Sequence, residues 1–166
     1  MPEKKTLERA AKAKRQGKSP STQAGAFVKE QIDHIREGKH GAKSAKQAIA
    51  IGLSEARRSG VKMKPPKKST TSAAARKKAA QDTKAAHRTT KSPSTESKAK
   101  RSATSTRVLK RESTKAASHK SLSRQTHAAA SRRSAADRSA AAKKGWATRR
   151  ANAAKSKGSH SRHASR

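Results

Sequence analysis

Apolar positions recur at helical spacing in two stretches near the start of the chain. The first stretch places five apolar residues on one face of a helix: Ala24, Phe27, Val28, Ile32 and Ile35. Ser19 can cap this helix with Pro20 at its first position, and Gly38 follows its last turn. The pattern predicts a helix between Ser19 and Gly38.

The second stretch shows the same periodicity about ten residues later. Its stripe contains six small or apolar residues: Ala45, Ala48, Ile49, Gly52, Leu53 and Ala56. Ser44 and Gln47 have the spacing of a capping box, and Gly60 has the place of a helix-ending glycine. Val61 is then placed to pack on Ala56. These features predict a second helix.

The two stripes can bury each other as a helical hairpin across the turn Gly38–Gly41. A weaker helix is expected before them, from Pro2 to Gln16, with Gly17 at its end. We therefore expect a small all-α N-terminal module of two to three short helices over residues 1–60. A hairpin of this size buries few side chains, so we hypothesise that residues 20–60 also form a homodimer.

After residue 60 the periodic pattern ends. Lys, Arg, Ala, Ser and Thr fill 83 of the 106 positions from 61 to 166, and Pro65-Pro66 lies at the join. The whole chain has only 15 large apolar residues, which is too few for a core of ordinary size. We therefore predict a mostly disordered protein, with residues 61–166 as a disordered, helix-prone basic tail. Its segments 72–88 and 123–155 are expected to become helical on a polyanion.

The net positive charge of the chain indicates a polyanion as its binding partner. The chain carries 44 Lys+Arg against 10 Asp+Glu, a net charge of +34, and +26 of it lies in residues 61–166. Such a surplus predicts phosphate neutralisation without base recognition. The candidate nucleic-acid-binding residues are the clustered cations and one aromatic residue: Arg57, Arg58, Lys67, Lys68, Arg76, Lys77, Lys78, Lys110, Arg111, Arg132, Arg133, Lys143, Lys144, Trp146, Arg149 and Arg150.

Trp146 allows two interpretations. Gly145 could end a helix, so that the indole folds back on Ala141 as an apolar cap. Alternatively, the ring could lie on a base while the flanking cations hold phosphates. Both interpretations stay open at this stage.

Other chemistry finds little support in the sequence. The chain has no cysteine and no Gly-rich phosphate loop, and its carboxylates are scattered. The pair His160 and His163 lacks Cys or acidic partners, so we expect no metal, no cofactor, no small-molecule substrate and no enzymatic activity. The longest run with large apolar side chains, Ala48–Ile51, cannot span a bilayer, which leads us to expect a cytoplasmic, nucleoid-associated protein.

Two resemblances add to this picture. The motifs Pro-Glu-Lys-Lys-Thr-Leu-Glu-Arg-Ala, Gly-Lys-Ser-Pro-Ser-Thr-Gln-Ala-Gly and His-Ile-Arg-Glu-Gly-Lys-His-Gly-Ala-Lys-Ser-Ala-Lys-Gln-Ala-Ile-Ala-Ile-Gly-Leu are similar to those of a family of short basic bacterial proteins without assigned function. The Lys/Ala/Ser/Thr/Pro composition of residues 61–166 resembles the carboxy-terminal domains of linker histones and of linker-histone-like bacterial proteins. The second resemblance implies DNA condensation.

The leading hypothesis is a non-enzymatic protein that binds and condenses DNA without sequence preference. An RNA-binding or ribosome-associated protein is the first alternative, although one Phe, one Trp and no Tyr leave few residues for base stacking. A protein-interaction adaptor that uses residues 20–60 is the second.

Overall fold

The first three helices end before the glycines that the sequence predicted, and the second and third begin after the predicted serines. The computed structural model describes residues 2–66, 71–87 and 98–161. Three helices open the chain: α1 (Lys4–Arg15), α2 (Pro20–Arg36) and α3 (Ala45–Arg58). Each is followed by a glycine in the left-handed region, Gly17, Gly38 and Gly60, with φ of 67°, 73° and 87°. After α3, the amide of Val61 donates to Ala56 O at 3.0 Å, as in a Schellman motif.

Serine side chains cap α2 and α3. Ser19 Oγ accepts a hydrogen bond from the amide of Thr22 at 3.4 Å, with Pro20 as the first helical residue. Ser44 Oγ accepts from the amide of Gln47 at 3.3 Å. Gln47 Oε1 in turn accepts from the amide of Lys43 at 2.8 Å, one residue before the donor of a standard capping box. The predicted cap is therefore present in a slightly shifted form.

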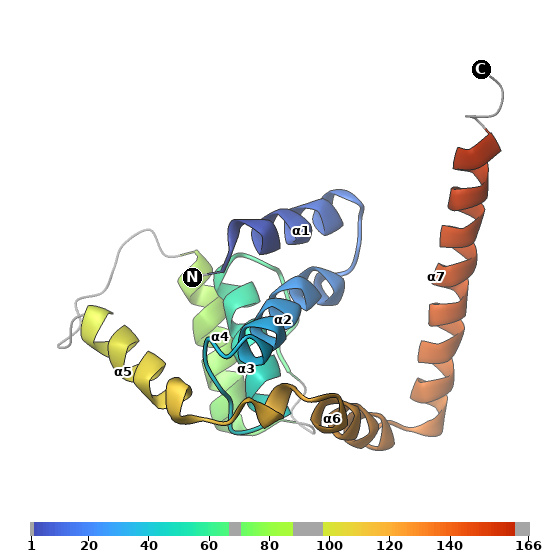
Figure 1. Cartoon of the computed structure of the whole chain (residues 1–166). Helices are drawn as coiled ribbons and strands as arrows, with labels where there is room; N and C mark the ends of the chain where they lie inside the picture. The colour runs from blue at the N-terminus through green and yellow to red at the C-terminus, as the bar shows by residue number, and fades with distance from the viewer. Residues whose placement is uncertain (1, 67–70, 88–97, 162–166) are drawn as a thin grey trace. The chain divides into compact units, whose positions relative to one another are not determined.

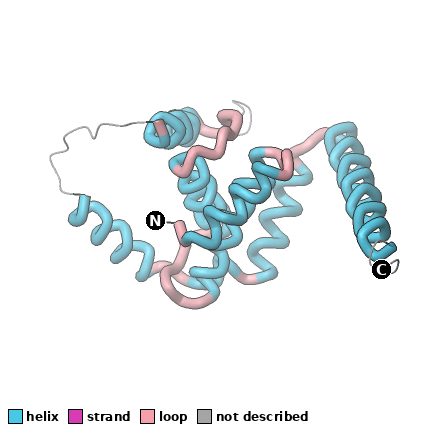
Figure 2. Tube along the Cα trace, turned by 90° about the horizontal axis from the view of Figure 1, so that it is seen from above, coloured by secondary structure: helices cyan, strands magenta, loops and turns pink. Residues whose placement is uncertain are grey.

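The second half of the chain is helical as well. Its described residues form four α-helices and one 3₁₀-helix: α4 (Ala73–Ala86), α5 (Lys98–Arg111), η1 (Thr114–Ala117), α6 (His119–Ser131) and α7 (Ala135–Ser161). Serine hydroxyls accept from backbone amides at the starts of α4, α6 and α7, namely Ser72, Ser118 and Ser134. The described residues contain helices and loops and no strand (Figure 2). The prediction of a mostly disordered chain is wrong.

The α2–α3 hairpin is held together by close backbone approach. Figure 1 shows α1 to α4 gathered into one bundle around this pair. At Gly52 of α3, a Cβ atom would lie 2.7 Å from Val28 Cα of α2. Phe27 is fully buried beside this contact, in a cluster with Ala24 and Ala56. The small residues of α3 thus let a single aromatic ring fill the space between the helices.

A segment of the predicted disordered tail completes a second apolar cluster. Ala116 and Ala117 of η1 are buried there together with Ile35 of α2. Arg36 Nε donates to Ala117 O at 3.1 Å, and the amide of Gly41 donates to Leu109 O at 2.9 Å. These bonds dock the chain around residues 109–117 onto the hairpin, far along the sequence from it.

Alanine explains why the prediction of disorder failed. Nine of the twelve buried apolar residues in the described part of the chain are alanines. A count of large apolar residues misses a core in which helices approach closely over methyl groups. Contacts divide the chain into two compact units, residues 1–123 and 124–166. The predicted boundary at residue 60 does not coincide with this division. The homodimer through residues 20–60 stays a prediction.

α4 is anchored to α3 by a buried carboxylate. Asp82 is 3% exposed and accepts a hydrogen bond from Ser54 Oγ at 2.7 Å. Arg58 Nε lies 3.8 Å and Lys78 Nζ 3.4 Å from Asp82 Oδ1. Loss of these partners would leave a buried carboxylate uncompensated, which is strongly destabilising. Two of the predicted phosphate ligands therefore already face an acid.

The carboxyl group of Glu55 should make the stability of the fold depend on pH. Burial, together with the nearby carboxylate of Glu30, raises the pKa of Glu55 above its usual value, against a hydrogen bond donated by Gln31 Nε2 at 2.8 Å. A raised carboxylate pKa means that the folded state holds the proton more tightly than the unfolded state, so stability falls as pH rises through this window. We expect Glu55→Gln to unfold at higher urea than the wild type at pH 7, because the amide keeps an acceptor for Gln31. The difference should shrink as pH falls below the ordinary pKa of glutamate, and an unchanged difference would contradict the assignment.

Candidate nucleic-acid interface

One face of α7 combines two cations with the exposed tryptophan. Lys143, Trp146, Ala147 and Arg150 have the i, i+3, i+4, i+7 spacing of a helix face and line a shallow depression of about 410 Å³. The guanidinium carbon of Arg149 lies 5.5 Å from the centre of the Trp146 ring, within the range of a cation–π contact. Trp146 remains 59% exposed. The face offers an aromatic surface between positive charges.

The structure excludes one of the two interpretations of Trp146, the apolar cap at a helix end. α7 continues through Gly145, which does not adopt a positive φ, so the predicted helix end at this residue is wrong. A glycine inside a helix costs only about 1 kcal/mol relative to alanine, and the alanine-rich flanks offset that cost. Because no cap folds the indole back on Ala141, the ring is available to a ligand.

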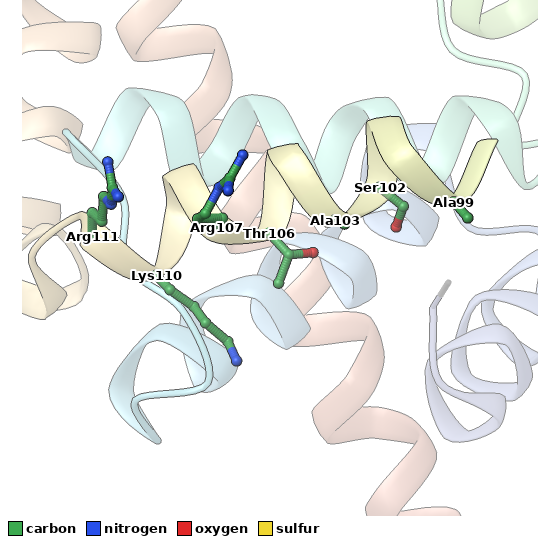
Figure 3. A pocket seen from close by; sticks show the side chains of 7 residues that line it. All are labelled: Ala99, Ser102, Ala103, Thr106, Arg107, Lys110 and Arg111. Atoms are coloured by element: carbon green, nitrogen blue, oxygen red, sulfur yellow. The ribbon is translucent and has the colours of Figure 1, made fainter. Parts of the chain in front are cut away.

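α5 presents a second positively charged surface. A shallow depression of about 740 Å³ runs along this helix, between small side chains near its start and cations near its end (Figure 3). In this view Lys110 projects on the same side as Thr106, whereas Arg107 and Arg111 project on the other side. The sequence of α5 contains six Lys or Arg residues and no acid. Its end contacts the hairpin through Leu109 O, and the cations of α5 from Lys100 onward are exposed.

The remaining predicted cations differ in their surroundings. Arg132 and Arg133 are exposed between α6 and α7, Lys144 is exposed on α7, and Lys77 is exposed on α4. Arg57 is only 8% exposed and its guanidinium lies 3.5 Å from Leu53 O, so it is not placed to meet a phosphate.

The other cations around α4 are engaged in part or fall outside the described residues. Arg58 and Lys78 lie beside Asp82. Arg76 is half-buried, and its Nε is buried without a hydrogen-bond partner. Lys67 and Lys68 lie outside the residues that the structure describes. The surface around α3 and α4 is therefore less open to an anion than the clustered sequence indicated.

The sequence prediction overlooked several isolated cations that the structure exposes. All fifteen Lys and Arg residues between positions 100 and 150 are exposed, against two acids in that interval, Glu112 and Asp137. Arg107, Lys115 and Arg138 are among those that the search for paired cations passed over. Their signal is the scarcity of acids around them rather than pairing.

Residues 4–68 match a family of unknown function, DUF6496. The match covers α1 to α3 and less than half of the chain. It ends before α4. Comparisons with curated proteins and with solved structures gave no match. Among the described residues, no helix is both long and apolar enough to cross a membrane.

Proposed function

We propose that this chain is a non-enzymatic protein that binds double-stranded DNA without sequence preference, by neutralising phosphates with cations on its helices. The observation that carries the proposal is the run of fifteen exposed Lys and Arg residues from 100 to 150 with only two acids. DNA has one negative charge per about 1.7 Å of helix axis, and each neutralised phosphate releases counterions. The cations are spread around the helices, which suits contact with the backbone rather than with base edges.

The helical form of this region supports binding. α7 has 27 residues, which corresponds to about 40 Å at 1.5 Å per residue, and its cations recur on successive turns. A chain that is already helical loses less conformational entropy on binding than a disordered tail does. This replaces the expectation that the tail becomes helical only on its partner.

Duplex DNA is favoured over single-stranded RNA by the aromatic residues. Phe27 is fully buried, so Trp146 is the exposed aromatic residue of a chain with one Phe, one Trp and no Tyr. Proteins that bind single strands stack several bases on aromatic side chains. The proposal includes association with chromosomal DNA. In a bacterial cell, this DNA is the nucleoid.

The proposal predicts a steep salt dependence. If the protein neutralises about ten phosphates, the slope of log K against log salt should be near −9 for duplex DNA. Fluorescence anisotropy with two duplexes of unrelated sequence should give the same slope and similar affinities. A slope shallower than about −3, or strong preference for one sequence, would show that base contacts dominate. Tighter binding to a single-stranded RNA of equal length would favour the RNA alternative.

A further inference from the structure

Three side chains of the first compact unit bring potential metal ligands together. Glu30 and His34 are four residues apart on α2 and therefore lie on one face of it, and Glu3 immediately precedes α1. One ligand atom from each of the three lies within 4.8 Å of the others. His34 Nε2 and Glu3 Oε1 are 2.9 Å apart. Residues separated by 27 to 31 positions in the sequence thus converge at one place.

Glu30 supplies a second, independent observation. The residue is 5% exposed, and its Oε1 accepts a hydrogen bond from the amide of Glu3 at 2.8 Å. Its Oε2 is buried and has no hydrogen-bond partner. Glu30 lines a hollow of about 280 Å³ together with Glu3 and His34. A carboxylate oxygen that is buried without a partner is costly, unless a cation binds it.

We propose that Glu3, Glu30 and His34 bind one divalent transition-metal ion, with Zn²⁺ as the best match to their chemistry. Imidazole and carboxylate are both normal Zn²⁺ ligands, at about 2.0–2.2 Å from the metal. The two carboxylates balance the charge of the ion, and three protein ligands leave a fourth position for water. The ion takes the place of the proton between His34 Nε2 and Glu3 Oε1 and satisfies Glu30 Oε2.

Lys39 can give up its contact with Glu3 when the ion binds. Lys39 Nζ lies 3.5 Å from Glu3 Oε1 and 2.9 Å from Glu37 Oε2. When Zn²⁺ binds Glu3, Lys39 keeps its shorter contact with Glu37. Three other cations also line the hollow and lower its affinity for a metal ion: Lys5, Arg9 and Lys29.

The consequence is structural. Glu3 lies just before α1, whereas the other two ligands belong to α2, so the ion joins the start of the chain to the hairpin. α1 contributes few buried side chains, Thr6 and Ala10. A metal that binds only the folded state stabilises it in proportion to its concentration over its dissociation constant. The ion therefore adds to the attachment that the buried Ala10 already gives α1.

The test is Zn²⁺ titration of the full chain by calorimetry, together with thermal unfolding. The wild type should bind one equivalent tightly, and its melting temperature should rise by several degrees at saturating Zn²⁺. His34→Ala and Glu30→Gln should each weaken this binding at least tenfold and abolish the rise. His87→Ala, at the exposed end of α4, is the matched control and should behave as the wild type does.

Glu30→Gln separates a metal ligand from a merely structural residue. Its amide can still accept the hydrogen bond from Glu3, and the uncompensated charge disappears, so without metal the variant should melt at least as high as the wild type. Only the Zn²⁺-dependent increment should be lost. Equal Zn²⁺ affinity and equal stabilisation in the wild type and both ligand variants would overturn the proposal, since they would indicate adventitious binding by other histidines. Absence of any Zn²⁺-dependent stabilisation of the wild type would overturn it as well.

Discussion

Gly52→Ala should destabilise the protein by about 1–3 kcal/mol in urea unfolding, although alanine is the better helix former. The added Cβ would lie 2.7 Å from Val28 Cα and 2.8 Å from Val28 N. These are backbone atoms of α2 and cannot turn aside as a side chain does. The two helices must therefore separate, which opens the cluster around Phe27. Few large side chains are available to fill the resulting gap.

Gly25→Ala provides the matched control. Gly25 also lies inside a helix, α2, but it is exposed and a Cβ there meets nothing within 4 Å. This substitution should raise the free energy of unfolding by about 0.5–1 kcal/mol, through helix propensity alone. If Gly52→Ala stabilised the protein as Gly25→Ala should, the close contact between α2 and α3 would be absent in solution.

Neutralising four cations of α7 should lower duplex DNA affinity by one to two orders of magnitude, roughly, at physiological salt. The variant replaces the exposed residues Lys143, Lys144, Arg149 and Arg150 by Gln. Each lost phosphate contact should reduce the salt slope by about 0.9. Glutamine has a helix propensity close to those of Lys and Arg, so the helix content by circular dichroism should not change.

The same charge change on α1 is the control. Lys4, Lys12, Lys14 and Arg15 are exposed. Gln in their place removes four charges from residues 1–60, which also hold six of the ten acids of the chain. We expect this variant to lose less than half as much of the salt slope. An equal loss from both variants would mean that net charge alone, and not the cations of the second half of the chain, determines binding.

Two substitutions at Trp146 test the aromatic contact. Trp146→Ala and Trp146→Leu should both lose about 1–3 kcal/mol of DNA affinity if the indole lies on a base. If Trp146→Leu keeps the affinity of the wild type while Trp146→Ala loses it, the residue contributes only apolar surface. If neither variant loses affinity, the cations alone account for binding.

Local patterns in the sequence were sufficient for the helix ends. Gly17, Gly38 and Gly60 end the first three helices as predicted, because only glycine adopts the left-handed conformation at little cost. Ser19 and Ser44 start α2 and α3 for an equally local reason, since a nearby hydroxyl accepts from an unpaired amide. Ser72 and Ser134 give the same kind of local signal at the starts of α4 and α7, within segments that were expected to be helical only on a polyanion. The surplus of cations over acids is likewise a property of the sequence alone.

Tertiary structure decided how the core forms and which groups meet. Large apolar residues are scarce, yet alanines and Gly52 bring helices close enough to bury one another, and this depends on distances between segments far apart in the chain. For the same reason the sequence did not show that Ala117 packs on the hairpin or that Arg57 is buried. The approach of Glu3 to Glu30 joins residues from separate helical segments, and no local pattern records such a distance. Helix ends follow from neighbours along the chain, whereas the core and the candidate metal ligands follow from neighbours in space.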